Sequence, residues 1–222
     1  MAGAQTPGPE PGTGPFDPVR EWPAHPRRLL TAEVVFDTMV PFCFACVNRV
    51  QLLRDAFAGR AHIPDRVRGE LAGLSNGNEQ ALPLLLPVPF AQVHTLDRSG
   101  AARALTRQQA WHGVSAIDAD PSKDRGEAEA HELCAQNPGW VLVSQDANAL
   151  NHGKRVRVPV LSAPDVLLVI AARRLCLPAN AWKIYKMMVA AGLYPARFWP
   201  DDKASETRFL ELADQLLRDP SS

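Results

Sequence analysis

Short apolar stretches alternate with helix-like stretches from Leu29 onward, and this alternation constrains the fold more than any other feature of the sequence. The apolar, strand-like stretches are at 33–36, 61–63, 91–96, 140–144 and 158–161. The helix-like stretches are at 50–57, 65–74, 102–111, 126–135, 148–152, 166–175, 179–191 and 205–217. Apolar strands that alternate with helices are typical of a parallel sheet covered by helices on both faces. The pattern therefore predicts a three-layer α/β domain with a mainly parallel sheet, followed by C-terminal helices.

Composition divides the chain into three segments. Residues 1–27 hold seven prolines and four glycines and show almost no apolar periodicity, so we expect a disordered tail there. Residues 28–177 are predicted to form the α/β domain, and residues 178–222 a helical extension packed on it. Within the domain, residues 112–123 are predicted to form a polar loop between two helices.

Charge and cysteine content exclude several classes of protein. The chain has 24 basic and 24 acidic side chains, which argues against a coat-like nucleic-acid binder, although a local basic groove would be hidden in that total. Four cysteines are too few for a disulfide-stapled scaffold, and no secretory segment opens the chain. The most apolar run, around 166–170, is interrupted by Arg173 and Arg174, so no membrane span is expected. We expect a cytoplasmic protein.

Two aspartates follow strand-like stretches at the point where each stretch ends. Asp37 comes directly after Val34-Val35-Phe36, and Asp146 lies two residues after the stretch 140–144. In an open parallel sheet, ligands bind outside the carboxyl ends of the strands. Either aspartate alone could simply cap the helix or turn that follows it. Two of them at equivalent strand ends favour a shared site.

Other acids are placed to join these aspartates. Glu127 and Glu129 lie in the first turn of the helix predicted at 126–135, and Glu70 lies near the end of the helix at 65–74. Because Glu127 and Glu129 are two residues apart, only one of them can readily face a given cleft. Convergent carboxylates repel one another, and a divalent cation removes that repulsion. Oxygen ligands favour Mg²⁺ or Mn²⁺, and such a site can serve the hydrolysis of a phosphodiester.

At these residues the chain resembles PIN-domain proteins, and in particular the ribonuclease toxins of bacterial toxin–antitoxin pairs. The resemblance extends over residues 32–175. Its carriers are Val34-Val35-Phe36-Asp37-Thr38, Ala61-His62-Ile63-Pro64 with Glu70-Leu71, Gly126-Glu127-Ala128-Glu129-Ala130, and Val141-Leu142-Val143-Ser144-Gln145-Asp146 followed by Val158-Pro159-Val160. The ordered set, rather than any single motif, carries the resemblance.

The resemblance implies a PIN-like fold and a metal-dependent endoribonuclease that uses Mg²⁺ or Mn²⁺. Asp37 matches the family's first aspartate, Glu129 the acid before alanine in the central helix, and Asp146 the aspartate after the fourth strand. These three would be the catalytic residues and would hold metal, with Glu127 and Glu70 as further metal ligands.

The resemblance also implies an RNA substrate, a homodimer and a small antitoxin protein that blocks the cleft. Two positions depart from the family pattern. Met39 stands where the family usually has a small polar residue, and Asn148 stands where a second acid often follows Asp146. These departures favour an alternative, a non-catalytic PIN-like module that binds RNA or a partner protein.

Basic residues follow the second aspartate and could contact an RNA backbone. Lys154, Arg155 and Arg157 come just beyond Asp146, and a nuclease needs phosphate-binding charge near its metal site. The alternative for each of these residues is a solvated basic surface.

Two further patterns carry weaker alternatives. Cys43-Phe44-Ala45-Cys46 is a Cys-x-x-Cys that could serve a thiol oxidoreductase, although its aromatic neighbours suggest burial. Glu127 and His131 are four residues apart on one predicted helix. That spacing allows a shared transition metal, and an ion pair or a hydrogen bond is the simpler interpretation.

Overall fold

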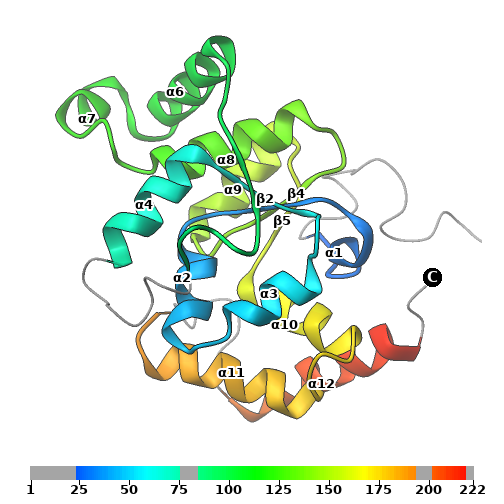
Figure 1. Cartoon of the computed structure of the whole chain (residues 1–222). Helices are drawn as coiled ribbons and strands as arrows, with labels where there is room; N and C mark the ends of the chain where they lie inside the picture. Colours follow the sequence, from blue (N-terminus) through cyan, green and yellow to red (C-terminus); the bar gives the residue numbers. More distant parts are fainter. Residues whose placement is uncertain (1–23, 76–84, 194–201, 219–222) are drawn as a thin grey trace, which may run out of the picture.

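A five-stranded sheet lies at the centre of the fold, and all of its strand pairs are parallel. The computed structural model describes residues 24–75, 85–193 and 202–218 (Figure 1). The strands are β1 (Val34–Phe36), β2 (Ala61–Pro64), β3 (Gln92–His94), β4 (Val141–Val143) and β5 (Val160–Leu161). Their order in the sheet is β3-β2-β1-β4-β5. The predicted α/β class with a parallel sheet between helices is therefore confirmed.

The strand order reverses at β1. The chain first builds outward from β1 through β2 to β3, and then crosses to the other side of β1 to add β4 and β5. Ligand sites of open α/β sheets lie at such a reversal, outside the carboxyl ends of the strands. Here the reversal lies between β1 and β4, whose last residues, Phe36 and Val143, are paired.

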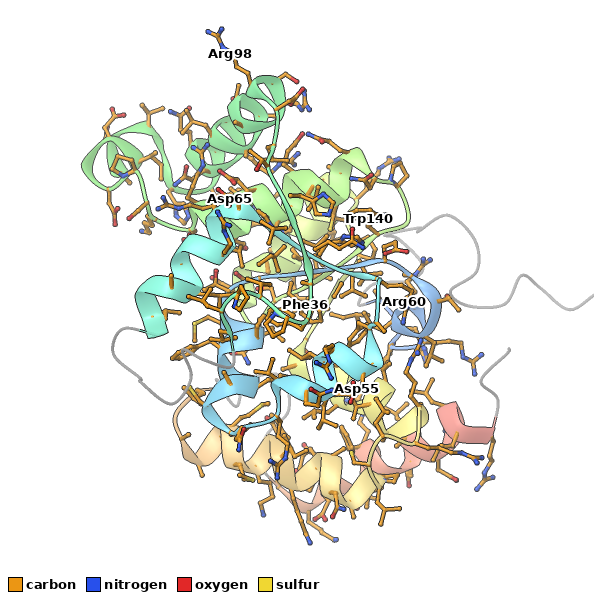
Figure 2. All side chains as sticks on the ribbon, in the orientation of Figure 1. Phe36, Asp55, Arg60, Asp65, Arg98 and Trp140 are labelled. Carbon is orange, nitrogen blue, oxygen red and sulfur yellow. The ribbon has the colours of Figure 1, made fainter. Side chains whose placement is uncertain are left out.

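The sheet separates two apolar cores. Val34 and Phe36 pack into the larger core and Val35 into the smaller one, because successive side chains of a strand point to opposite faces. All three side chains are fully buried. This burial explains why the strand is an uninterrupted apolar run. In Figure 2, Phe36 lies among the packed side chains of the interior.

Helices cover both faces of the sheet. Those on the side of the larger core are α1 (Arg28–Thr31), α2 (Met39–Cys46), α3 (Val50–Ala56), α10 (Ala163–Ala172), α11 (Pro178–Ala190) and α12 (Lys203–Arg218). On the other side, the smaller core is formed with α8 (Arg125–Gln136) and α9 (Ala147–Val156). The remaining described helices are α4, α6 and α7. α4 (Asp65–Ser75) contacts β2 and α8 and adds Val67 and Leu71 to the larger core. α6 (Arg98–His112) packs on α8, and α7 (Val114–Ala119) follows it.

Residues 112–123 differ from the sequence prediction. The expected polar loop is wrong, because a short helix, α7, occupies Val114–Ala119. Gly113 ends α6 with a φ of 83°, a conformation that favours glycine, and so lets a second helix start in a new direction. Ile117 is buried and anchors α7 to the domain.

The ends of the described chain pack against the larger core. Ala24 is buried in that core, and residues 1–23 of the predicted tail lie outside the described residues. Trp182 and Tyr185 of α11 and Phe209 of α12 are also buried there, with the rings of Trp182 and Phe209 5.4 Å apart. Among the described residues, none of the helices combines the length and the apolar character needed to cross a membrane.

Candidate functional site: a carboxylate cleft

A cleft of about 950 Å³ opens beside the carboxyl ends of β1 and β4. Five acidic residues from four parts of the chain line it, and they are Asp37, Glu70, Asp124, Glu127 and Asp146. Four of these five were predicted as site residues from the sequence. Asp37 and Asp146 meet here because β1 and β4 are neighbouring parallel strands whose carboxyl ends lie at one edge of the sheet.

Asp37 is one of the two predicted ligands that are buried, at 7% exposure against 6% for Glu127. Its Oδ2 accepts a hydrogen bond from Ser144 Oγ at 2.8 Å, and its Oδ1 accepts one from the Thr38 amide at 2.5 Å. Burial and the nearby carboxylates of Glu127 and Glu70 outweigh these two bonds and raise the pKa of Asp37 to about 7. A carboxyl group that ionises only near neutral pH lies where a cation would relieve the repulsion.

Glu70 reaches the cleft from α4 and is held by three donors. It accepts hydrogen bonds from Thr38 Oγ1 at 2.5 Å and from the Gly126 amide at 3.0 Å, and Arg66 Nε lies 3.4 Å from its Oε1. A side chain at Gly126 would clash with the Glu70 carboxylate, since an added Cβ would lie 2.8 Å from Glu70 Cδ. Glycine at this position therefore lets α8 begin directly against Glu70.

Glu127 and Glu129 face different directions from α8, as their spacing requires. Glu127 lines the cleft and is buried. Glu129, which the resemblance had placed among the catalytic residues, does not line this cleft and forms an ion pair with Arg125 at 2.8 Å. The structure thus brings together Asp37, Asp146 and Glu127, and it sets Glu129 apart from them.

Asp124 is a cleft residue that the sequence reasoning missed. It precedes α8 in a left-handed conformation with a φ of 51°. Its carboxylate lies 2.8 Å from His112 Nε2. Burial and the charges of Glu127 and Asp146 raise the pKa of Asp124, although His112 opposes this. An aspartate directly before a helix is a recognised N-terminal signal, and it could have drawn attention to this position.

One of the two departures from the family pattern, Met39, lies in the cleft. Met39 lines the cleft, so a thioether stands beside Asp37 in place of a small polar group. The side chain of Asn148 lies outside the described residues.

The predicted RNA-contacting residues lie at the far end of α9. Lys154, Arg155 and Arg157 are exposed, and Lys154 is eight residues after Asp146. At a rise of 1.5 Å per residue this is about 12 Å along the helix axis from the cleft. A basic side chain that does line the cleft is Arg66 of α4, which is 41% exposed beside Glu70.

A second group of polar side chains lies behind Glu127, and we call it the helical cluster. It consists of Glu127 and His131 from α8, His152 from α9 and Trp111 from α6. Glu127 Oε1 lies 3.7 Å from His131 Nε2 and 3.4 Å from His152 Nδ1. Burial alone would raise the pKa of Glu127, but the two imidazoles outweigh it and lower the pKa to about 2.

The tryptophan of the helical cluster fixes one of the imidazoles. The ring of Trp111 stacks on the ring of His152 at 3.9 Å, with 3° between the planes, and meets His131 edge-on at 5.2 Å. His131 is fully buried, which lowers the pKa of its imidazole. The sequence spacing had linked Glu127 with His131, whereas His152 enters only through the packing of α9 on α8.

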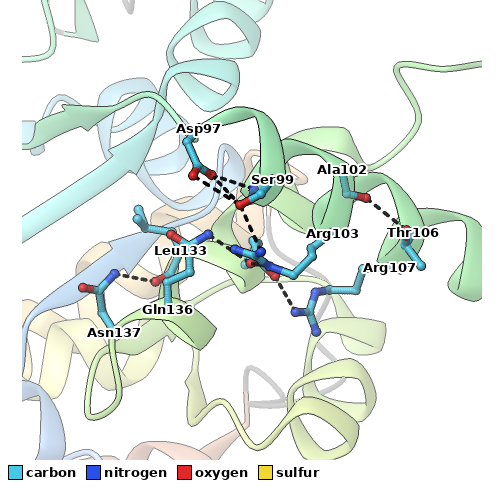
Figure 3. A network of polar contacts seen from close by, with 11 residues as sticks. Asp97, Ser99, Ala102, Arg103, Thr106, Arg107, Leu133, Gln136 and Asn137 are labelled. Carbon is cyan, nitrogen blue, oxygen red and sulfur yellow. Dashed lines mark hydrogen bonds and ion pairs between the residues drawn. The ribbon is translucent and has the colours of Figure 1, made fainter.

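An ion-pair network holds α6 on α8 and so positions Trp111 (Figure 3). Arg103 and Arg107 of α6 each donate to a different carboxylate oxygen of Glu132 on α8, both at 2.6 Å. Glu132 is almost completely buried, and Gln136 donates to its Oε1 as well. Paired, hydrogen-bonded charges of this kind resist rearrangement, because leaving one partner unpaired in the interior is costly.

Cys43 of the Cys-x-x-Cys pattern is not placed for redox chemistry. It is buried on α2, where its sulfur lies 3.3 Å from Gln145 Nε2 and 3.3 Å from the Leu193 carbonyl oxygen. Burial raises the pKa of the Cys43 thiol to about 12, although the contact with Gln145 opposes this. Reactive cysteines have a lowered pKa, so this environment argues against a thiol oxidoreductase.

No protein-family model, no curated protein and no solved structure matches this chain. The resemblance to PIN-domain proteins therefore stays a prediction drawn from the residues.

Proposed function

We propose that the carboxylate cleft is the active site of a metal-dependent endoribonuclease that hydrolyses RNA phosphodiester bonds. The convergence of five acidic residues at the switch point of a parallel sheet carries this proposal. Burial and the neighbouring carboxylates raise the pKa of Asp37 and Asp124, and a divalent cation would offset both effects. Oxygen ligands in an open cleft suit Mg²⁺ or Mn²⁺.

The proposed roles follow from the position of each side chain. Asp37 and Asp146 would hold the cation, with Glu127 as a further ligand on the opposite wall. A bound cation would supply an activated hydroxide and neutralise charge on the phosphate. Glu70 joins α4 to the start of α2 through Thr38 and to α8 through Gly126, and thereby maintains the cleft.

RNA would approach along the rim of the cleft. Arg66 would bind the phosphate adjacent to the bond that is cleaved, and the exposed bases Lys154, Arg155 and Arg157 would contact the backbone farther along the strand. The role as a toxin, with a small antitoxin protein and a homodimer, rests on the family resemblance alone, and the cytoplasmic location rests on the composition of the sequence.

A second candidate is the non-catalytic PIN-like module that binds RNA or a partner protein. Two observations favour it. Both oxygens of Glu70 are already engaged by donors from the protein, and Met39 occupies part of the cleft wall. In this case the acids would shape a binding surface without holding an ion.

Two measurements test the proposal. One is the melting temperature of the protein with and without Mn²⁺, and the other is cleavage of a mixed-sequence single-stranded RNA. Asp37→Asn and Asp146→Asn should abolish both cleavage and the Mn²⁺-dependent rise in melting temperature. A ligand at about 100 times its Kd adds about 2.7 kcal/mol to the stability of the native state. Metal-free Asp37→Asn should melt at or above the wild-type temperature at pH 8, because the variant removes a buried charge.

Two further variants complete the design. Asp214→Asn alters an exposed acid on α12 and should leave cleavage unchanged. Glu129→Gln tests whether Glu129 is catalytic. The family resemblance implies that this variant loses activity, whereas the position of Glu129 outside the cleft implies that it keeps activity. An unchanged wild-type melting temperature in Mn²⁺, together with metal-independent RNA binding, would favour the non-catalytic module instead.

A further inference from the structure

The carboxylate cleft does not account for the two histidines behind it. His131 and His152 come from different helices, yet both present a ring nitrogen to the same carboxylate oxygen, Glu127 Oε1. The three ligand-type atoms all lie within 4.8 Å of one another. All three side chains belong to buried residues, so the group is shielded from bulk solvent.

The distances fit a coordination site better than a hydrogen-bonded triad. Hydrogen bonds between nitrogen and oxygen are usually 2.7–3.2 Å long, and both contacts here are longer, at 3.4 and 3.7 Å. Ligand atoms held tetrahedrally at about 2.1 Å from a metal are separated by about 3.4 Å. The spacing of these atoms therefore leaves room for an ion between them.

His131 provides a second and independent observation. Both of its ring nitrogens are buried, and within the described part of the chain neither has a hydrogen-bond partner. Buried polar groups in native proteins are nearly always hydrogen-bonded, and an unpaired one requires an explanation such as an ion. A metal ligated by Nε2, the nitrogen that faces Glu127, would account for one of the two.

The surroundings hold the imidazoles in place. Trp111 stacks on His152, and the pairing of Arg103 and Arg107 with Glu132 fixes the helix that carries Trp111. Metal sites gain affinity from such support, because it orients the ligands before the ion binds.

We propose that Glu127, His131 and His152 form a binding site for a first-row transition-metal ion, with Zn²⁺ as the favoured occupant. Two imidazoles and one carboxylate suit Zn²⁺, whereas Mg²⁺ and Ca²⁺ prefer oxygen ligands alone. The site shares Glu127 with the oxygen-only site proposed in the cleft, differs from it by its two imidazole ligands, and does not depend on RNA hydrolysis. Glu127 lines the cleft as well, so Zn²⁺ could enter from the cleft. The Glu127 carboxylate could then bridge the Zn²⁺ ion and a cation held by Asp37.

Titration of the chelator-treated, full-length protein with Zn²⁺ alone tests the site. We expect one equivalent to bind and to raise the melting temperature. His131→Leu removes one ligand, and His152→Phe removes another while keeping a ring to stack on Trp111. Each variant should bind Zn²⁺ more than about 100-fold more weakly, since loss of an outer partner alone weakens metal sites by about 10–100-fold.

Matched variants separate this site from the cleft. His94→Phe alters a histidine that also touches a tryptophan and a second histidine, but away from Glu127, and should leave Zn²⁺ affinity unchanged. Asp37→Asn should lose the Mn²⁺ effect and keep Zn²⁺ binding. The proposal is overturned if wild type binds no Zn²⁺, or if His131→Leu and His152→Phe both bind it as tightly as wild type. Zn²⁺ binding without any RNA cleavage would contradict the proposed nuclease and leave this site supported.

Discussion

Two clusters in this protein contain the same side-chain types, namely one glutamate, two histidines and one tryptophan. They differ in the hydrogen bonds that these side chains make. The helical cluster lies behind the cleft. The second, which we call the strand cluster, lies along the sheet and consists of Glu33, His62, His94 and Trp140. In each cluster one imidazole stacks on the indole, at 4.1 Å for His62 on Trp140. Trp140 is labelled in Figure 2.

The strand cluster is closed by hydrogen bonds. His62 Nε2 lies 2.7 Å from Glu33 Oε2, and His62 Nδ1 lies 2.8 Å from His94 Nε2. Strand register brings these groups together, since His62 of β2 lies beside β1 and β3. Neighbouring strands are about 4.8 Å apart, which suits direct hydrogen bonds between their side chains.

The helical cluster remains open because three helices, rather than adjacent strands, set its distances. Helix axes pack 8–10 Å apart, so facing side chains can leave a gap that an ion fills. The comparison shows that residue types alone do not define a metal site. The backbone that presents the ligands decides whether they bond to one another or to a metal.

The largest expected difference between the clusters is in stability without metal. At pH 8 with chelator, His62→Leu should lower the free energy of unfolding by about 2 kcal/mol, since it removes two hydrogen bonds worth about 1 kcal/mol each. His131→Leu should change it less than His62→Leu does, because it loses only the 3.7 Å contact with the Glu127 carboxylate and no hydrogen bond. Urea denaturation measures both values, and a larger loss for His131→Leu than for His62→Leu would contradict the distinction.

A smaller difference is expected in the response to pH. Burial lowers the pKa of both His131 and His94 below 6.5, so the unfolded chain binds more protons as the pH falls. The free energy of unfolding should therefore decrease below about pH 6.5, by up to about 1.4 kcal/mol per pH unit for each extra proton bound. His131 faces Glu127, His152 and Arg107, and it is fully buried.

We accordingly expect His131→Leu to flatten this pH dependence more than His94→Leu does, because His94 is less buried. Urea denaturation of the chelated proteins between pH 7 and pH 5 measures the slopes. Equal slopes for the two variants would show that the deeper burial of His131 does not increase the pH dependence of the free energy of unfolding.

The smallest effect concerns the link between the helical cluster and the cleft. Glu127→Gln should lower the pKa of Asp37 from about 7, but only in part, because burial is the larger cause of the shift. Glu33→Gln in the strand cluster should leave that pKa unchanged, as should Glu129→Gln on the outward side of α8. Carboxyl carbon NMR of the metal-free protein follows the titration. An identical response to all three variants would exclude a specific contact between Glu127 and Asp37.

Much of the fold could be predicted because it follows from local patterns. Apolar runs located four of the strands, and β3 lies within the stretch predicted at 91–96 although its side chains are not buried. Pro64 ends β2 where the next helix starts. Helix ends were less predictable. α10 begins at Ala163, because Ser162 and Asp165 form a capping box and Pro164 suits the first turn. The apolar periodicity alone had suggested a later start.

The candidate site could be predicted only where strand ends fix it. The sequence placed Asp37 and Asp146 at the carboxyl ends of strands, and parallel pairing of β1 with β4 then made them neighbours. Spacing showed that Glu127 and Glu129 face different directions, but only the rotation of α8 about its axis decides which one faces the cleft. Asp124 was missed because its position depends on a left-handed turn.

Hydrophobic periodicity by itself thus determined the layered α/β architecture and one acidic edge of the sheet, since strands and helices form from neighbours in sequence. The tertiary structure alone decided the helical cluster. Trp111, His131 and His152 are separated by about 20 residues from one to the next and are aligned by the packing of α6, α8 and α9. Their contacts depend on helix rotation and on buried ion pairs such as that of Glu132, and no local pattern encodes these.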